Sequence, residues 1–396
     1  MTESASIHSG FPPNKQVAQT EATHRLTFWG TYDLSKPRTR ILLDGLRKQS
    51  VEVLELHARI WPDHADKSQL SMRSFAVATI WALLCYPALI IRLFRSPRDA
   101  VLVVPYLGAL DVLMLWPFAK LRGQRIVWDM FLSLYDTVVN DRKMVRRRHP
   151  VALALYVTEY LAARAADLVT LDTQAHADYV SRLYKLSNKK TAAIPVGAEV
   201  EKFPRLPPPR QATSATQILF YGQLIPLHGV ETILEAARSP RGQAYHWHFI
   251  GTGQDQPKVE EVLSKGAMDH VVWEPWVEYD DLIDAIERSQ ICLGIFGTSE
   301  KAASVVPNKV YQALCAGRPV ITRASAAIEE TFGPNDALLT VPPADPEAIL
   351  DAIEAHIANG FPAMPRDQLK IARSDVIGER FAELLNRSVQ AEGDTT

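Results

Sequence analysis

Residues 217–238 read QILFYGQLIPLHGVETILEAAR, in which a strand, a turn bounded by glycines and a helix follow one another. The apolar run Ile218–Tyr221 predicts a buried strand, and Val230–Arg238 has the spacing of an amphipathic helix. Between them, Gly222 and Gly229 let the backbone approach a ligand closely, and the helix N-terminus offers N–H groups to an anion. We expect a phosphate to bind here, although a turn that needs glycine only for its geometry stays an alternative.

The same alternation of strands and helices continues on both sides of this unit, which predicts parallel sheets wrapped by helices. The chain has 396 residues, more than one core usually supports, and the proline-rich stretch FPRLPPPRQATSAT at 203–216 predicts a boundary. We therefore expect two Rossmann-like doubly wound domains facing a cleft. The expected parts are a disordered tail 1–24, an acceptor-side domain 25–203, a linker 204–216, a donor domain 217–375, and a helix and tail 376–396 that could cross back to the first domain.

The expected strands are short apolar runs. In the first domain they are Leu26–Trp29, Val51–Leu56, Val101–Val104, Ile126–Trp128, Leu168–Leu171 and Ala192–Ile194. In the second they are Ile218–Tyr221, His246–Ile250, Val271–Trp273, Ile291–Phe296 and Pro319–Thr322, with helices at Val230–Arg238, Asp280–Arg288 and Asn308–Ala316 and a polar loop at Thr298–Ser304.

Composition excludes several classes of protein. Hydrophobic residues make up 47% and charged residues 22% of the chain, and the net charge of −2 gives no electrostatic reason to bind nucleic acid. The three cysteines are too few and too widely spaced for a disulfide framework or a zinc site, so we expect inert thiols in a reducing compartment. We find no carboxylate or histidine cluster with metal-ligand spacing and expect no metal or other cofactor.

Two further segments point to the same sheet edge. Gly251 and Gly253 follow the second strand of the donor domain, and a phosphorylated ligand suits paired glycine turns at one edge. In PNKVYQALCAGRPVI, residues 307–321, a helix is expected to begin near Asn308 and to end before Gly317. Lys309 then lies in the first turn, an unfavourable place for a cation unless an anion is near, although a solvated lysine stays an alternative.

The order of these motifs resembles the C-terminal domain of glycosyltransferase family 4, over about Gln217 to Glu330. Members of that family are retaining nucleotide-sugar enzymes with the GT-B fold. The N-terminal half resembles them more loosely. The residues that carry the resemblance are Gly222, His228-Gly229, Ile250–Gly253, Trp276-Val277 and Val310–Val320, together with Gly30, Asp129, Ala166–Val169 and Ile194–Gly197.

Departures from the family pattern affect charge. The family has arginine and lysine after the first strand of this domain, and this chain has Gln223 and His228 there. The family also has two glutamates eight positions apart, and this chain has Ser304 and Gln312 at those positions. Lys301 and Lys309 could replace the missing cations. The expected donor-binding residues are Gly222, Gln223, Gly229, Gly251, Gly253, Val277, Lys301, Ser304, Asn308 and Gln312.

The resemblance implies transfer of a sugar with retention, with the donor phosphate accepting the acceptor's proton. Lys309 and His228 are expected to stabilise the leaving diphosphate. Asp129 stands where relatives carry a histidine near the sugar, although a capping role is an alternative. Acceptor contacts are expected at the end of the first strand, at Gly30, Thr31, Tyr32, Arg38 and Arg40. The two arginines suit an anionic acceptor such as a lipid diphosphate, although pairing with surface carboxylates stays an alternative.

Residues 74–91 carry no charged side chain and are flanked by arginines. A core helix, a helix lying in a membrane surface and a spanning helix are all compatible with that length. The basic run at 142–148 could be a solvated face or could bind anionic headgroups. The first two dozen residues lack the apolar core of a secretory signal, so we expect a cytoplasmic protein, peripheral on the inner face of the cell membrane.

The expected function is therefore transfer of a sugar from a nucleotide-sugar to a glycan or polyprenyl-diphosphate-linked acceptor in exopolysaccharide or cell-envelope synthesis. One alternative is a nucleotide-sugar epimerase or an inverting transferase, which would need a base such as Asp129. Another is a catalytically silent nucleotide-binding scaffold, which the neutral Gln223, Ser304 and Gln312 keep open.

Overall fold

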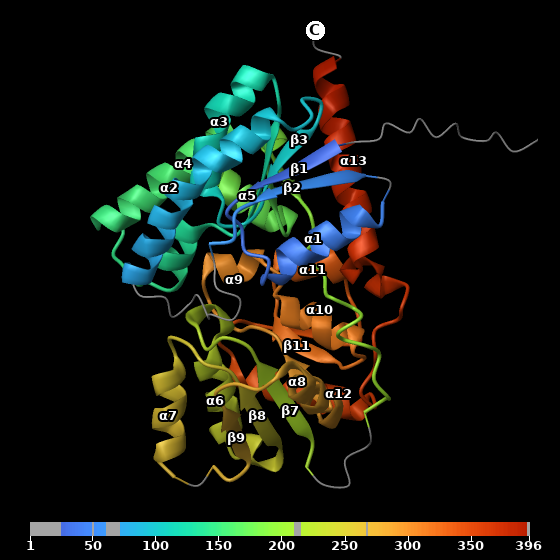
Figure 1. Ribbon diagram of the computed structural model, residues 1–396. Coiled ribbons are helices and arrows are strands. Elements are labelled where there is room, and N and C mark those ends of the chain that lie inside the picture. Colours follow the sequence, from blue (N-terminus) through green and yellow to red (C-terminus); the bar gives the residue numbers. More distant parts are fainter. Residues whose placement is uncertain (1–24, 50, 61–71, 210–214, 267, 394–396) are drawn as a thin grey trace, which may run out of the picture.

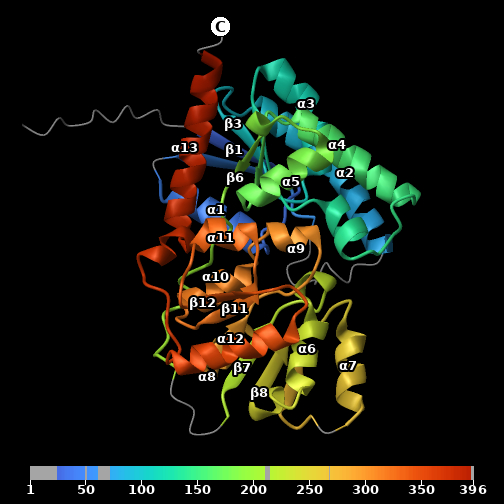
Figure 2. The ribbon, with the colours of Figure 1, turned by 180° about the vertical axis from the view of Figure 1, so that it is seen from behind.

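Two parallel sheets, each covered by helices on both faces, make up the part of the chain that the computed structural model describes. The described residues are 25–49, 51–60, 72–209, 215–266 and 268–393. The predicted tail 1–24 and residues 210–214 of the predicted linker lie outside them. Figure 1 shows one domain above the other, and Figure 2 shows the same two layers from behind.

The first sheet has the order β2-β1-β3-β4-β5-β6, with parallel neighbours throughout. Helices α2 to α5 pack on one face, and α1 with the C-terminal helix α13 packs on the other. The strands are β1 Arg25–Gly30, β2 Glu52–His57, β3 Val101–Val104, β4 Ile126–Phe131, β5 Leu168–Leu171 and β6 Thr191–Ala193. The helices are α1 Pro37–Arg47, α2 Met72–Phe94, α3 Ala109–Arg122, the π-helix η2 Asp136–Asp141, α4 Pro150–Ala165, α5 Gln174–Tyr184 and the 3₁₀ turn η3 Asn188–Lys190.

The second sheet has the order β12-β11-β10-β7-β8-β9, in which β7 and β10 lie where the strand order reverses. Helices α8, α10 and α11 cover one face, and α6, α7 and α12 cover the other. Its strands are β7 Gln217–Tyr221, β8 His246–Ile250, β9 Val271–Glu274, β10 Ile291–Leu293, β11 Val320–Arg323 and β12 Leu338–Val341. Its helices are η4 Pro226–His228, α6 Val230–Arg238, η5 Gly242–Ala244, α7 Gln256–Ser264, α8 Tyr279–Arg288, α9 Glu300–Ser304, α10 Asn308–Cys315, α11 Ala326–Phe332, α12 Pro346–Ala358 and η6 Gln368–Ala372.

The last helix, α13 Ser374–Gly393, returns to the first domain and runs beside α1 (Figures 1 and 2). Ile377 and Phe381 join the apolar core beneath α1. The two helices cross at glycines, because a Cβ on Gly45 would lie 2.0 Å from the carbonyl oxygen of Ser374 and one on Gly378 would lie 2.2 Å from Gly45. Direct backbone contact therefore ties the end of the chain to the first domain.

The predicted fold class is confirmed, and each predicted strand is present with shifts of a few residues at its ends. Two elements differ from the sequence analysis. Strand β12 was not predicted, and the predicted polar loop Thr298–Ser304 contains the short helix α9. That helix forms because the Ser299 hydroxyl accepts a hydrogen bond from the Ala302 amide at 3.1 Å and caps its first turn.

The long apolar helix α2 packs one side against the first sheet through Ala82, Tyr86, Leu89 and Leu93, all of which are buried. In the described part of the chain, no helix combines the length and the apolar character needed to cross a bilayer. The interpretation as a core helix therefore fits the side of α2 that packs on the sheet, whereas the opposite side of α2 is exposed.

Candidate donor site at the carboxyl edge of the second sheet

The carboxyl ends of β7 and β10 meet at the point where the strand order reverses, and loops leave this edge in opposite directions. Such switch points form ligand crevices in doubly wound sheets. Gly222 follows β7, and residues 294–297 follow β10 before α9. Lys309 stands in the first turn of α10, which enters from the same edge.

The ammonium group of Lys309 lies inside this edge of the sheet. The residue is 7% exposed, and within the described residues its Nζ makes no hydrogen bond. Nζ lies 3.9 Å from the centre of the Phe220 ring, a cation–π arrangement. Burial lowers the pKa of Lys309 well below its ordinary value. A Cβ on Gly222 would lie 3.1 Å from Nζ, so the absence of a side chain at Gly222 leaves space beside the ammonium.

His228 lies next to this lysine. Its Nδ1 is hydrogen-bonded to the carbonyl oxygen of Gln223, and its ring packs edge-on against Phe220. Burial, and then the nearby charges of Lys309 and Arg142, lower the pKa of His228 well below its ordinary value. Both effects disfavour the protonated ring, and an anion bound beside it would favour protonation.

Three of the predicted donor-site glycines are required by packing between backbones. A Cβ on Gly251 would lie 1.8 Å from the carbonyl oxygen of Gly222, and one on Gly253 would lie 2.4 Å from that of Leu224. Gly229 has φ of +63° and lies against the backbone of Phe296. These glycines bring the turns after β7, β8 and β10 together and so fix the position of Gly222.

Arg142 is a residue of this edge that the sequence analysis did not single out. It follows the π-helix η2 of the first domain, and its Nη2 donates to Oε1 of Gln223 at 3.0 Å. The side chain of Gln254 donates to its carbonyl oxygen at 2.9 Å. The contact between Arg142 and Gln223 could not be predicted from sequence, because Arg142 begins a basic run that is typical of a solvated or headgroup-binding face.

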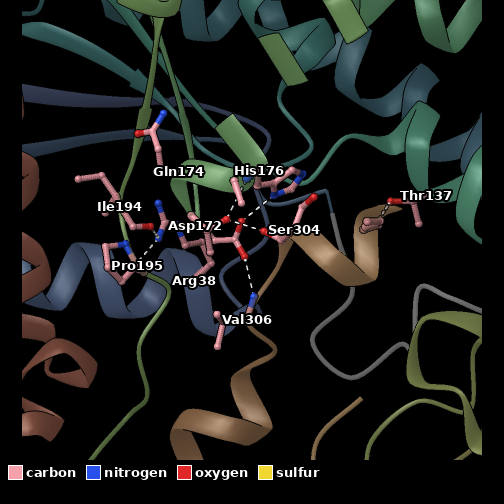
Figure 3. Close-up of polar contacts among 12 residues, drawn as sticks. Arg38, Thr137, Asp172, Gln174, His176, Ile194, Pro195, Ser304 and Val306 are labelled. Atoms are coloured by element: carbon pink, nitrogen blue, oxygen red, sulfur yellow. Dashed lines mark hydrogen bonds and ion pairs between the residues drawn. The ribbon is translucent and has the colours of Figure 1, made fainter. Parts of the chain in front are cut away.

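Further contacts join the two domains beside this edge. Lys301 donates to the hydroxyl of Thr137, and Ser299 donates to Asp141 at 2.7 Å, so α9 is bonded to the π-helix. Figure 3 shows the adjoining group, in which the carbonyl oxygen of Ser304 accepts from Thr173 and the Val306 amide donates to Asp172 at 3.4 Å. Lys301 and Ser304, both predicted to bind the donor, thus bond to the first domain.

Comparison with known proteins places this geometry in a family. Residues 215–359 match the family model described as glycosyl transferases group 1. Solved structures with the same fold include sucrose-phosphate synthase from Thermosynechococcus elongatus, at 16% identity and a TM-score of 0.66 over 93% of this chain and 100% of that one. HepE from Anabaena has 13% identity and a TM-score of 0.60, over 92% of this chain and 99% of that one. The lipopolysaccharide outer core galactosyltransferase WaaB has 14% identity and a TM-score of 0.58, over 93% of this chain and 99% of that one. A search of curated protein sequences finds no match.

Residues 215–359 thus carry a group 1 glycosyl transferase domain, and the chain as a whole has the GT-B fold. Asn308 and Gln312 stand one turn apart on α10, and both are half-buried. Val277 is half-buried and packs against the core of the second domain. Donor binding by these three residues stays a prediction.

Arg38 and Asp129 bind each other, and their predicted roles in acceptor and sugar contact stay predictions. Their side chains are 1% and 0% exposed, and Nε and Nη2 of Arg38 donate to the two carboxylate oxygens of Asp129 at 3.0 and 2.7 Å. Thr170 donates to the same carboxylate, and Nη1 of Arg38 donates to the carbonyl oxygens of Ile194 and Pro195, both at 2.7 Å (Figure 3). In this arrangement both side chains are buried and bonded to other groups of the first domain.

The other predicted acceptor residues also have partners within the first domain. Arg40 forms an ion pair with Glu199 at 2.6 Å, and Tyr32 donates to Glu55 at 2.9 Å. The amide of Thr31 donates to Asp111 at 2.9 Å, and a Cβ on Gly30 would meet the same carboxylate at 2.4 Å. The lipid-diphosphate role of Arg40 is thus not supported by its contacts.

Within the described residues, no three His, Cys, Asp or Glu side chains are grouped so that they could hold a metal ion. Metal-independent activity stays a prediction, since the donor's phosphates could themselves bring a cation.

The buried Arg38–Asp129 pair generates a test of stability. Asp129→Ala leaves a buried guanidinium without its partner, and we expect a loss of about 3–5 kcal/mol in the free energy of unfolding, measured by urea denaturation. Glu199→Ala, which breaks the more exposed pair of Arg40, should cost about 1 kcal/mol or less. An Asp129→Ala enzyme with wild-type stability and no transferase activity would instead assign the carboxylate to catalysis.

Proposed function

We propose that this glycosyltransferase transfers a sugar from a nucleotide-sugar donor to a glycan or lipid-linked acceptor, with retention, in the synthesis of a cell-envelope or extracellular polysaccharide. Support for the donor class comes from similar structures, since HepE is described in complex with UDP-glucose and the pneumococcal O-GlcNAc transferase GtfA with UDP and GlcNAc. Support for the pathway comes from WaaB, a lipopolysaccharide outer core galactosyltransferase.

The observation that carries the proposal is the ammonium group of Lys309. A buried cation without a hydrogen-bonding partner costs free energy, and an apolar side chain at this position would avoid that cost. The lysine stands beside the side-chain-free Gly222, at a sheet edge where ligands bind in this fold. An anion in this space would satisfy the ammonium, and the diphosphate of a nucleotide-sugar is the anion that a glycosyltransferase binds.

An ammonium group beside the diphosphate would also assist the sugar-transfer reaction. As the bond from the anomeric carbon to the donor's phosphate oxygen breaks, its electron pair stays on that oxygen, and the acceptor oxygen forms the new bond. The acceptor's proton passes to the leaving phosphate. Negative charge therefore grows on the diphosphate during transfer, and a preorganised ammonium next to it lowers the barrier.

The rival functions have less support. An epimerase or an inverting transferase would need a base in the cleft, and Asp129, the first candidate, is buried and bonded to Arg38 and Thr170. A silent nucleotide-binding scaffold would use the same buried lysine to bind a diphosphate, so only a measurement of sugar transfer separates it from a transferase.

Donor binding and transfer can be measured directly. In a thermal-shift panel of UDP-, GDP- and ADP-sugars, we expect at least one donor to raise the melting temperature, because a ligand that binds only the native state stabilises it. Incubation of that donor with acceptor should release nucleoside diphosphate, and NMR of the product's anomeric proton should show the donor's configuration. Absence of any shift across the panel would contradict donor binding, a shift without release of nucleoside diphosphate would favour the silent nucleotide-binding scaffold, and an inverted product would contradict retention.

Substitution of Lys309 should separate stability from function. Lys309→Met removes the buried ammonium, and we expect the nucleotide-free enzyme to gain about 1–3 kcal/mol in urea denaturation while nucleotide binding in calorimetry is lost. Lys265→Met, at an exposed lysine of the same domain, should leave both unchanged. Wild-type nucleotide affinity in Lys309→Met would remove the lysine from the donor site.

A second part of the proposal concerns the outer face of α2, α3 and α4, which lie together on one side of the first domain (Figure 1). Large apolar side chains are exposed on all three helices: Val77, Ile80, Trp81, Leu83, Leu84, Ile91 and Phe94 on α2, Leu110, Trp116 and Leu121 on α3, and Leu153, Val157 and Leu161 on α4. Exposed arginines flank the helices at Arg92, Arg95, Arg98 and Arg146–Arg148. An apolar face with a basic rim suits an anionic membrane surface, where a lipid-linked acceptor would be found.

Vesicle binding tests this face. We expect the enzyme to co-sediment with vesicles containing phosphatidylglycerol, less so at high salt, because screening weakens the attraction of the arginines. Trp81→Glu with Leu84→Glu should abolish sedimentation, since both side chains are more than half exposed. Val272→Glu, at an exposed apolar residue of the second domain, is the matched control. Sedimentation that survives both high salt and the double substitution would contradict membrane docking.

A further inference from the structure

Arg142 is held against the donor edge by two hydrogen bonds from the other domain. Its side chain donates to Gln223, in the turn after β7, and its carbonyl oxygen accepts from Gln254, in the turn after β8. These are the two turns that the glycines bring together beside Lys309. The backbone and the side chain of Arg142 are thus both positioned by the loops that form the proposed phosphate site.

The guanidinium group has hydrogen-bonding capacity that these contacts leave unused. A guanidinium carries five N–H donors, and the bond to Gln223 takes one of them. Its Nε is buried and has no hydrogen-bond partner within the described residues. Gln223 orients the group through a neutral amide oxygen and so adds no negative charge beside Arg142.

Other charges around Arg142 also indicate an anionic ligand. Lys309 and Arg142 are both close enough to His228 to lower its pKa. The carboxylate of Asp141 attracts both Lys301 and Arg142, and it accepts a hydrogen bond from Ser299, so its charge is shared between two cations. Cationic groups from two domains therefore converge on one edge where Lys309 has no counterion.

The segment that carries Arg142 is fixed in this position by the second domain. The π-helix η2 precedes it directly, and Lys301 and Ser299 of the second domain bond to Thr137 and Asp141 of that helix. π-Helical turns are rare and occur frequently at functional sites. Contacts between the domains thus hold the guanidinium at the donor edge before any ligand binds.

We propose that Arg142 is a donor-binding residue that reaches across from the first domain and, with Lys309, holds the phosphates of the nucleotide-sugar. The inference rests on the proposed function and extends it, because the donor site then draws its charge from both domains and is complete only when they are arranged as in this structure. Gln223 is the neutral residue that aims the arginine.

The test uses the full-length enzyme and nucleoside diphosphates. UDP, GDP and ADP are first ranked by calorimetry, and the tightest is measured with each variant. Arg142→Gln should weaken its binding about 10- to 100-fold, the range expected for a charged hydrogen-bonded contact to phosphate, and should reduce the salt dependence of the dissociation constant. Arg238→Gln, at an exposed arginine of the second domain, should bind as the wild type.

Two substitutions at Gln223 test whether the charge of Arg142 at this edge is what binds the nucleotide. In the Arg142→Gln background, Gln223→Arg returns a guanidinium to the same edge and should recover at least part of the affinity. In the wild-type background, Gln223→Glu gives Arg142 a competing carboxylate and should weaken binding, and this variant serves if Arg142→Gln does not fold. Melting temperatures without nucleotide establish that each variant is folded.

The outcomes distinguish the two proposals. Wild-type affinity in Arg142→Gln or in Gln223→Glu, together with lost affinity in Lys309→Met, would overturn the role of Arg142 and leave the proposed function standing. Failure of the wild-type enzyme to bind any nucleoside diphosphate or nucleotide-sugar would overturn the proposed function itself.

Discussion

The ammonium group of Lys309, buried over the ring of Phe220 without a hydrogen-bond partner in the described chain, is the constraint around which the second domain is arranged. Proteins rarely bury a lysine unless something compensates its charge. The turns after β7 and β8 pack backbone against backbone, and a Cβ at Gly222 would lie only 3.1 Å from Nζ of Lys309, so glycine lets this turn approach the lysine closely. The buried lysine therefore lowers the stability of the fold, and it does so at the sheet edge where doubly wound folds bind ligands.

Charge at this edge comes from more than one domain. Gln223 is neutral, yet it binds the guanidinium of Arg142 from the first domain. Lys301 bonds to the first domain as well, through Thr137. The loss of positive charge from the turn after β7 is therefore offset by a residue that lies 81 positions earlier in the chain. Donor binding and the arrangement of the domains become linked, since any ligand that contacts Arg142 and Lys309 together favours the arrangement in which both are near.

The sheets and the donor edge could be predicted from sequence because their signals are local. Apolar runs such as Ile218–Tyr221 end at glycines, and parallel strands end at one edge, so Gly222 and Lys309 were placed in the same region without any long-range information. The pairing of Arg38 with Asp129 could not be predicted in this way. The two residues lie 91 positions apart, each stands at a strand end or helix start where ligand contacts are common, and only the packed structure shows that they neutralise each other. Arg142 was missed for a related reason, because its neighbours Lys143 and Arg146–Arg148 are exposed and make the whole run look like surface.

The segment from Asp136 to Pro150 connects the two sites of the proposed function. Arg142, near its start, contacts the donor edge, and Arg146–Arg148, near its end, are exposed directly before α4, whose outer side is apolar. An arginine at the donor phosphates and arginines at a membrane surface are therefore separated by only a few residues of one loop. Attraction of the later arginines to anionic headgroups would act on the same loop that positions Arg142. The proposed donor site and the proposed membrane-facing surface therefore share one loop, so we expect binding at one of them to affect binding at the other.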